Sequence, residues 1–247
     1  MEKYMTFDIL DKYDDLINLY TKRPFSLVSS ELRKQKELDE TTIEKWVGMN
    51  FKYVKMPKQT HTDKVVVLDE NNIEEEFDDV DGFITNLKDV AILTTSADCQ
   101  NVLIYDPVNK VIGNVHSGWK GTVKKVVINA LNIMIDKFNC KPENIIVCIS
   151  PSILKCCFEV EDDVVSLFKE AFDNIDEDIT LGDVKEGKQK YYIDTVNINI
   201  KEMMKLGLKK ENIVASQKCT MCNSLEYHSF RKDKENSGRN VALICMK

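Results

Sequence analysis

AILTTSADCQNVLIYDPVNKVIGNVHSGWKGT, at residues 91–122, is the most informative part of this sequence. It contains apolar runs at 91–95, 102–105 and 111–115, each with the length and the Val, Ile and Leu content of a buried strand. A segment at 122–138 follows, and its apolar residues recur at three- and four-residue spacing, which predicts a helix. This order of elements indicates a sheet that is covered by helices.

The same pattern continues on both sides of this stretch. Further strands are predicted at 64–68, 145–149, 213–215 and 241–245, and further helices at 162–172 and 195–206. Asp194 is placed to cap the last of these helices, and Gly207 is placed to end it. Because no Pro/Gly/Ser-rich linker interrupts these elements, we expect a single domain over residues 1–247 with a mixed α/β layered architecture.

Two seven-residue segments resemble each other. KPENIIV at 141–147 and KKENIVA at 209–215 each follow a predicted helix and lead into a predicted strand. One interpretation is an internal duplication of a helix–turn–strand unit. The other is that both segments use a common way of turning a helix into a strand.

The composition excludes several classes of function. Hydrophobic residues make up 43% and charged residues 30% of the chain, which is ordinary for a globular protein. The net charge of −7 disfavours nucleic acid and membrane surfaces as partners, and a small-molecule substrate is expected instead. No apolar run reaches the ~20 residues of a membrane-spanning helix or forms a signal peptide. The eight cysteines therefore predict a cytoplasmic protein with reduced thiols or thiolate metal ligands.

Histidine is scarce, and two of the three histidines lie beside predicted strands. His61 precedes one strand and His116 follows another, while Cys99 lies shortly after a third; His228 lies near the carboxyl end. Two imidazoles and one thiolate suit zinc, and three protein ligands leave a fourth tetrahedral position for water or substrate. We therefore predict a catalytic zinc site at His61, Cys99 and His116. Asp98, next to the cysteine, is the candidate acid or base.

A glycine-rich turn follows the predicted strand that ends beside His116. Residues 116–122, HSGWKGT, lead from this strand into a helix and present backbone N–H groups together with Lys120. Such a turn favours an anion such as phosphate. The alternative is a glycine-assisted turn in which Trp119 is simply packed.

The carboxyl-terminal part of the chain brings together further polar and aromatic side chains. Residues 227–231, YHSFR, could stack on a base and pair with an anion, or could form a solvated loop. Cys219 and Cys222 have CxxC spacing, but a second CxxC pair is absent from the sequence. We interpret these two cysteines and the adjacent pair Cys156 and Cys157 as structural thiols.

Several motifs together resemble the YfiH-like family, long named multicopper polyphenol oxidases or laccase-domain proteins and now regarded as purine nucleoside phosphorylases. The motifs are QTH at 59–61, DGFITN at 81–86, ADC at 97–99, HSGWKG at 116–121, SPS at 150–152, CCFEV at 156–160, CT at 219–220, SFR at 229–231 and GR at 238–239. They extend over nearly the whole chain, most firmly from residue 57 onward.

The resemblance implies a fold, an activity and a set of site residues. It implies an α+β fold with a layered α/β/β/α sandwich of mixed sheets, and zinc bound at the three residues predicted above. It also implies phosphorolysis of adenosine, inosine and methylthioadenosine with phosphate, together with adenosine deamination. The candidate contacts to nucleoside or phosphate are Gln59, Lys120, Arg23 and Arg231. Lys120 stands where relatives carry arginine, and the segment around Arg23 departs from the usual family pattern.

Alternative functions remain open from the sequence. Cys99 could be the nucleophile of a cysteine hydrolase or transferase, with His116 as its base. A copper-dependent polyphenol oxidase is a second alternative, because two histidines and one cysteine also bind blue copper, although three histidines in total cannot supply several coppers. A third is a non-enzymatic zinc domain in which His228 or Cys222 supplies the fourth ligand. In the plainest alternative, Cys99 is a small buried apolar residue and the histidines bond to the backbone.

Overall fold

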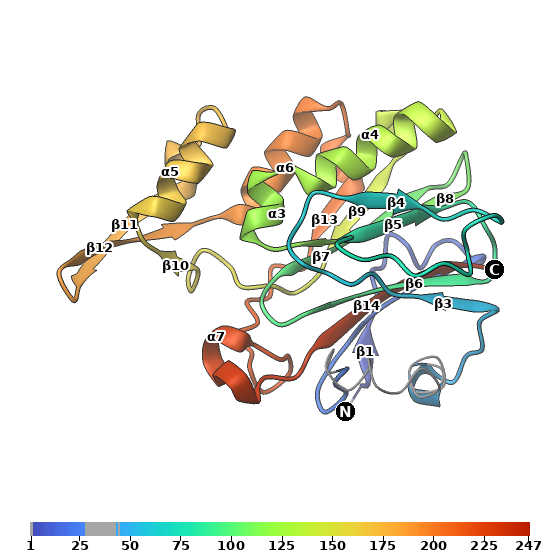
Figure 1. Cartoon of the computed structure of the whole chain (residues 1–247), viewed down its shortest axis with the longest axis horizontal. Coiled ribbons are helices and arrows are strands. Elements are labelled where there is room, and N and C mark those ends of the chain that lie inside the picture. Colours follow the sequence, from blue (N-terminus) through green and yellow to red (C-terminus); the bar gives the residue numbers. More distant parts are fainter. Residues whose placement is uncertain (1, 28–42, 44) are drawn as a thin grey trace.

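The computed structural model describes residues 2–27, 43 and 45–247. Two mixed sheets pack face to face, and helices cover the outer face of the larger sheet (Figure 1). The outer face of the smaller sheet packs against a separate apolar cluster that includes Phe25, Leu27 and Ile43, with Trp46 against it. The expected layered arrangement with mixed sheets is therefore confirmed.

The larger sheet has six strands in the order β13-β9-β7-β8-β5-β4. They are β4 (Val65–Val67), β5 (Gly82–Thr85), β7 (Gln100–Asp106), β8 (Val111–Ser117), β9 (Ile146–Ile149) and β13 (Ile213–Ala215). The pairs β4–β5 and β9–β13 are parallel, and the pairs between them are antiparallel. Each of these strands except β5 was predicted from its apolar run.

The smaller sheet has five strands in the order β1-β2-β14-β6-β3. They are β1 (Tyr4–Met5), β2 (Leu16–Thr21), β3 (Tyr53–Lys55), β6 (Val90–Ser96) and β14 (Asn240–Met246). The sequence predicted the two central strands β6 and β14. It missed β1, β2 and β3, because β1 and β3 are short and charged residues crowd the segment before β2.

Helices α3 (Trp119–Val123), α4 (Val126–Phe138) and α6 (Thr195–Lys205) lie over the six-stranded sheet (Figure 1). The prediction of one continuous helix over 122–138 was wrong: the chain turns helical at Trp119 and breaks before α4, where Lys125 has a left-handed φ of 59°. The predicted ends of α6 are confirmed. Asp194 accepts a hydrogen bond from the Asn197 N–H at 2.9 Å, and Gly207 has a φ of 102°.

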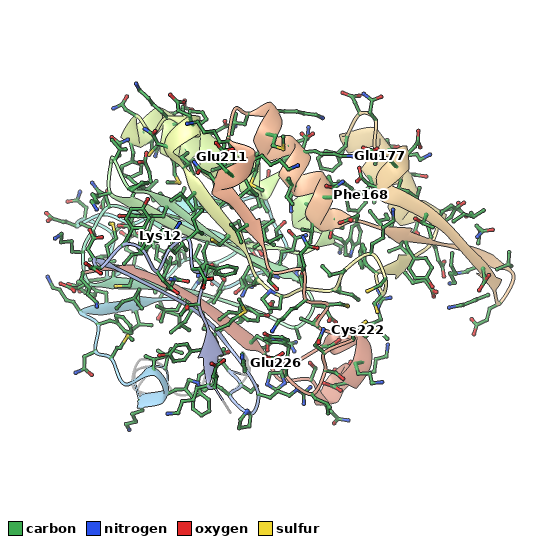
Figure 2. The ribbon with its side chains drawn as sticks, turned by 180° about the vertical axis from the view of Figure 1, so that it is seen from behind. Lys12, Phe168, Glu177, Glu211, Cys222 and Glu226 are labelled. Carbon is green, nitrogen blue, oxygen red and sulfur yellow. The ribbon has the colours of Figure 1, made fainter. Side chains whose placement is uncertain are left out.

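A third, three-stranded sheet with α5 (Asp162–Ala171) extends to one side of the sandwich (Figure 1). Its strands are β10 (Glu159–Val160), β11 (Ile179–Lys185) and β12 (Lys188–Ile193), and the sequence missed all of them because most of β11 is exposed and lacks an alternating pattern. Phe168 of α5 packs toward α6 in an apolar cluster with Ile198 (Figure 2).

The last helix, α7 (Phe230–Asp233), was also missed by the sequence analysis. No helix in the described ranges is long and apolar enough to span a bilayer.

The two similar segments of the sequence adopt the same local structure. In each, a 3-10 turn, η1 (Pro142–Asn144) or η3 (Lys210–Asn212), joins a helix to a strand. Two further 3-10 turns are η2 (Asp176–Asp178) and η4 (Lys234–Asn236). The strands that follow η1 and η3, β9 and β13, are parallel neighbours, and the Asn212 side chain donates to the Glu143 carbonyl at 3.1 Å. An internal duplication stays a prediction.

A buried asparagine joins the two large sheets. Asn114 on β8 donates from its amide nitrogen to the carbonyl oxygens of Ile92 on β6, at 2.9 Å, and of Ala242 on β14, at 3.0 Å. Its amide oxygen accepts from the Thr94 hydroxyl at 2.6 Å. Without these bonds, the Asn114 amide and the Thr94 hydroxyl would be buried without a partner.

We expect Asn114→Ala to lower the free energy of unfolding by about 3 kcal/mol, because it removes these bonds between sheets and leaves the Thr94 hydroxyl buried. Denaturant-induced unfolding, followed by circular dichroism, measures the change. Asn132→Ala, at an exposed asparagine on α4, is the control and should change stability little. A loss for Asn114→Ala no larger than for the control would contradict the prediction.

Candidate metal centre

The centre forms where the chain passes from one sheet to the other. β6 ends at Ser96 in the five-stranded sheet, and β7 begins at Gln100 in the six-stranded sheet. Cys99 lies in the tight connection between them, after Asp98, whose φ of 92° is unusual for a residue with a side chain. This turn sets Cys99 at the ends of β7 and β8, beside His116.

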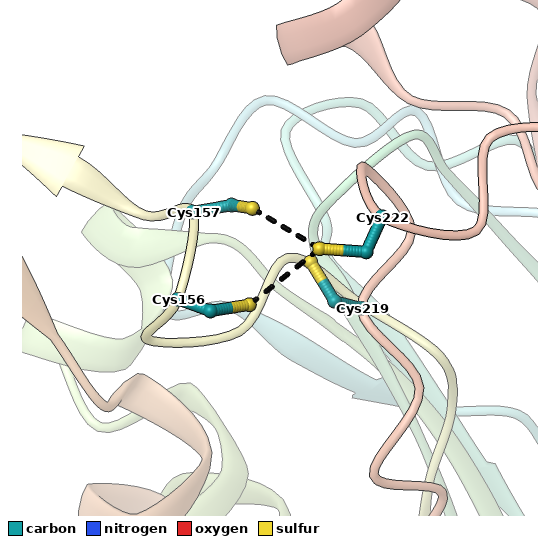
Figure 3. A group of neighbouring side chains, drawn as sticks. All are labelled: Cys156, Cys157, Cys219 and Cys222. Atoms are coloured by element: carbon teal, nitrogen blue, oxygen red, sulfur yellow. Dashed lines mark hydrogen bonds between the residues drawn. The ribbon is translucent and has the colours of Figure 1, made fainter.

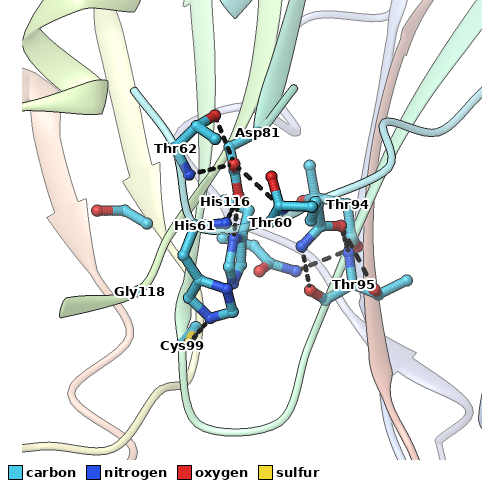
Figure 4. A network of polar contacts seen from close by, with 12 residues as sticks. Thr60, His61, Thr62, Asp81, Thr94, Thr95, Cys99, His116 and Gly118 are labelled. Atoms are coloured by element: carbon cyan, nitrogen blue, oxygen red, sulfur yellow. Dashed lines mark hydrogen bonds and ion pairs between the residues drawn. The ribbon is translucent and has the colours of Figure 1, made fainter. Parts of the chain in front are cut away.

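The three predicted ligands lie together, as Figure 4 shows. His116 is near the end of β8 and is buried, whereas His61 is exposed in the loop before β4. Their ligand atoms and Cys99 Sγ all lie within 4.8 Å of one another, and Cys99 Sγ is 3.8 Å from His61 Nε2. A tetrahedral zinc site with ordinary bond lengths places sulfur and nitrogen about 3.6 Å apart. The donor set therefore fits zinc.

A glycine provides the space that these side chains occupy. A Cβ atom on Gly118 would lie 2.7 Å from His61 Cδ2 and 2.9 Å from Cys99 Sγ. Both distances are shorter than any ordinary non-bonded contact. The glycine after His116-Ser117 is therefore required for the three ligands to approach one another.

A buried carboxylate, Asp81, orients both histidines (Figure 4). Its Oδ1 lies 2.8 Å from His116 Nδ1 and accepts from the His61 N–H at 3.1 Å. Its Oδ2 accepts from the N–H and the hydroxyl of Thr62, at 2.6 and 2.8 Å. Because a carboxylate accepts, His116 Nδ1 carries the proton and Nε2 remains for the metal.

Sequence reasoning gave Asp81 no role, although it begins the DGFITN motif. The available signal was an acidic residue directly before a strand, β5, whose residues are all buried. A buried acid needs hydrogen-bond donors around its carboxylate. The structure supplies them from His116 and from the loop at 60–62.

The centre favours a thiolate and a protonated imidazole when it is free of metal. Burial opposes ionisation of Cys99, but the charge and hydrogen bonds of His116 and His61 outweigh burial and lower the pKa of Cys99 to about 6. Burial also opposes protonation of His116, but Cys99 and Asp81 raise its pKa to about 9. The same contacts with His116 and Thr62 hold the pKa of Asp81 at about 2.

A pocket of about 160 Å³ opens beside Cys99. Its lining combines small, polar and aromatic side chains. Its lining residues are Ala97, Asp98, Cys99, Gln100, Ser117, Gly118, Trp119, Ile153, Phe158, Thr195, Phe230 and Arg231. A larger hollow of about 530 Å³ lies at the β4 edge of the sheet, and its lining includes none of the predicted site residues.

Asp98 and Arg231 both line this pocket and are joined directly. The Asp98 carboxylate accepts from the Arg231 N–H and from the Thr220 hydroxyl, each at 2.6 Å. The Arg231 guanidinium donates to the carbonyl oxygens of Cys157 and Glu159, at 3.3 and 3.1 Å. The two carboxylate oxygens therefore hold the carboxyl-terminal segment against the turn that carries Cys99.

The other predicted substrate contacts, Gln59, Arg23 and Lys120, are not among the residues that line the pocket. The Gln59 amide bonds to the backbone of Thr95, with its nitrogen donating and its oxygen accepting, each at 2.8 Å. Arg23 forms an ion pair with Asp233 of α7, and Lys120 lies over the Trp119 ring. Direct contact of these three residues with substrate stays a prediction.

A fourth protein ligand does not emerge from the described residues. His228 Nε2 donates to the Phe25 carbonyl at 2.9 Å, and Cys222 lies in a separate group of cysteines. Within the described ranges, the group around His61 contains three potential ligands. This arrangement favours a centre with an open position over a closed structural site.

The family model described as "Multi-copper polyphenol oxidoreductase laccase" matches residues 29–247. The chain belongs to this family. A purine nucleoside phosphorylase from Borreliella burgdorferi is 31% identical over 247 residues, which cover 98% of this chain and 96% of the relative. An adenosine deaminase, RL5, from an unknown prokaryotic organism is 32% identical over 213 residues, which cover 83% of this chain and 80% of the relative.

Solved structures share the fold of this chain. The hypothetical protein YfiH from Bacillus licheniformis has a TM-score of 0.86 at 21% identity, covering 99% of this chain and 97% of that one. YlmD from Geobacillus stearothermophilus has a TM-score of 0.86 at 18% identity, covering 100% of this chain and 97% of that one. The resemblance to the YfiH-like family and the layered fold that it implied are confirmed.

We expect Asp81→Asn to weaken zinc binding by about 10- to 100-fold, because an amide cannot accept from His116 and from Thr62 as the carboxylate does. Competition with a chromophoric chelator measures the affinity. Asp79→Asn is the matched control, since this exposed acid contacts neither histidine ring. Equal zinc affinity of the two variants would show that Asp81 does not orient the ligands.

We expect a plot of the logarithm of zinc affinity against pH to rise with two different slopes. Between pH 6 and 9, Cys99 is already ionised but His116 retains the proton that zinc must displace, so affinity should rise about tenfold per pH unit. Below pH 6, Cys99 is protonated as well and the slope should steepen. Calorimetric titration in buffers of different ionisation enthalpy counts the protons released. No proton release at pH 7 would contradict the thiolate–imidazolium pair.

Proposed function

We propose that this protein is a zinc-dependent enzyme that cleaves purine nucleosides with phosphate and also deaminates adenosine. The observation that carries the proposal is a three-ligand centre of His61, Cys99 and His116 at the wall of a pocket. The names of the relatives, purine nucleoside phosphorylase and adenosine deaminase, support the same chemistry. Adenosine, inosine and methylthioadenosine are the proposed substrates.

The protein's own residues prepare the centre. Zinc, when bound, supplies a Lewis-acidic position for a water or a substrate oxygen. Asp81 keeps the proton on His116 Nδ1 and fixes the loop that carries His61, so that the ligand atoms converge without rearrangement. The lowered pKa of Cys99, caused mainly by the positive charge of His116 acting against burial, provides a thiolate at neutral pH.

The pocket wall offers groups suited to a nucleoside and to phosphate. Phe158 and Phe230 present aromatic rings on which a purine can stack. Arg231 lies over the Phe158 ring at 5.9 Å and is the proposed phosphate contact, because it lines the pocket. In phosphorolysis, a phosphate oxygen forms a bond to the anomeric carbon while the bond to the purine nitrogen breaks, and the purine gains a proton.

Asp98 is proposed as a positioning residue in this reaction. Its carboxylate oxygens bind the Arg231 N–H and the Thr220 hydroxyl, and these bonds hold the arginine in the pocket wall. A role as acid or base stays a prediction, because it requires one of these bonds to be exchanged for a bond to substrate. We also propose that residues 1–247 form one catalytic domain, since His61 and Cys99 lie in connections that run from one large sheet to the other.

The lowered pKa of Cys99 also favours a second candidate function. A cysteine nucleophile with His116 as its base needs the same ionised thiol, which the charge of His116 stabilises against burial. That enzyme would remain active after metal is removed by a chelator. A multicopper oxidase is less well supported, because such an enzyme needs several copper sites bound largely through imidazole. Within the described residues, the group at His61, Cys99 and His116 is the one candidate metal group with histidine, and it contains two.

We expect Cys99→Ala to abolish formation of adenine and inosine from adenosine, because the variant lacks one of three metal ligands. Chromatography of reactions with and without phosphate separates the two products. Cys148→Ala, at a buried cysteine outside the centre, is the control and should retain activity. If activity survives zinc removal but is abolished by alkylation of Cys99, the result supports the cysteine-nucleophile enzyme and rejects the zinc enzyme. Unchanged product formation by Cys99→Ala would reject both.

A further inference from the structure

Four cysteines that the proposed function does not use meet at one point (Figure 3). Cys156 and Cys157 lie in the loop between β9 and β10, and Cys219 and Cys222 lie in the loop between β13 and α7. About sixty residues separate the two loops in sequence, yet all four side chains point toward one another. The structure thus provides the second cysteine pair that the CxxC segment lacks in the sequence.

The sulfur positions fit a metal site better than a disulfide. Cys222 Sγ is 3.4 Å from Cys157 Sγ and 3.8 Å from Cys156 Sγ, and all four sulfurs lie within 4.8 Å of one another. Zn–S bonds of about 2.3 Å in a tetrahedron place the sulfur atoms about 3.8 Å apart. A disulfide would require about 2.05 Å. One sulfur, that of Cys222, lies close to two others, which a disulfide does not explain.

The four sulfur ligands indicate which metal binds and what type of site it forms. Four thiolates in a tetrahedron are typical of structural zinc. Within the described residues, this group contains no carboxylate and no imidazole. Cys219 is buried, whereas Cys156 and Cys222 are exposed, so a metal ion can enter from solvent. Four protein ligands leave no open position, in contrast to the centre at His61.

Backbone contacts hold the two loops together independently of the sulfurs. The Ser152 N–H donates to the Lys218 carbonyl at 3.2 Å, and the Thr220 N–H donates back to the Ser152 carbonyl at 3.0 Å. The Cys219 carbonyl accepts from the backbone and the side chain of Asn223, at 2.9 and 2.8 Å. The ligands are therefore held close to one another before a metal binds.

We propose that Cys156, Cys157, Cys219 and Cys222 bind a structural zinc ion that is separate from the centre at His61. The ion fastens together the two loops that support the pocket wall. Thr220, between two of the ligands, donates to Asp98, and the Cys157 carbonyl accepts from Arg231. The inference does not depend on the proposed function, because it concerns a different set of residues.

The test uses the full-length Cys99→Ala protein, in which the centre at His61 has lost one ligand. We expect about one zinc per chain to remain after purification, with X-ray absorption showing sulfur alone around the metal at about 2.3 Å. Adding Cys222→Ser to this background should remove the zinc, since Cys222 has two of the short sulfur contacts. Adding Cys148→Ala instead is the control and should leave the zinc in place.

A second measurement covers the case in which the double variant fails to fold. A strong chelator should lower the thermal midpoint of the Cys99→Ala protein, and zinc should restore it. Absence of zinc in this protein, or zinc that survives Cys222→Ser, would overturn the proposal. So would an intact mass under denaturing conditions that shows two hydrogens lost to a disulfide among the four cysteines. Sulfur-only zinc in Cys99→Ala combined with inactive wild type would reject the proposed function alone.

Discussion

The hydrogen bonds accepted by the buried Asp81 carboxylate are the constraint on which the site depends. One oxygen holds the His116 imidazole, and the two oxygens together hold the backbone of the His61 loop. A carboxylate in this apolar position is stable only when charged or strongly polar donors surround it. The same bonds that satisfy Asp81 therefore set the tautomer of one ligand and the position of another.

The sandwich supplies the other half of the site. The chain leaves the five-stranded sheet at Ser96 and enters the six-stranded sheet at Gln100, so the turn with Cys99 lies between the two layers. Asn114 ties these layers together nearby through bonds to both β6 and β14. The position of Cys99 is thus set by the geometry of the fold, and the loops with the four cysteines contact Asp98 and Arg231 in the pocket wall.

Much of the site could be predicted because its ligands are chemically conspicuous. His61, Cys99 and His116 stood out as scarce residues beside apolar runs, and the structure brings them together. Asp81 was not assigned a role, since a single acid before a strand resembles many surface acids. The four cysteines were interpreted as separate structural thiols, because the distance in sequence between Cys157 and Cys219 hides their contact. Gln59 and Arg23 were chosen as substrate contacts, but their partners in the structure are Thr95 and Asp233.

The sequence alone determined the central strands β6 to β9, β13 and β14, the helices α4 and α6 within a residue or a few, and the choice of His61, Cys99 and His116 as candidate ligands. These features follow from local periodicity and residue chemistry, which can be read from a short stretch of sequence alone. Only the tertiary structure decided the break before α4, the third sheet, the role of Asp81 and the meeting of Cys156 and Cys157 with Cys219 and Cys222. Each of these depends on which distant segments become neighbours, and that is set by packing of the whole chain rather than by any one segment.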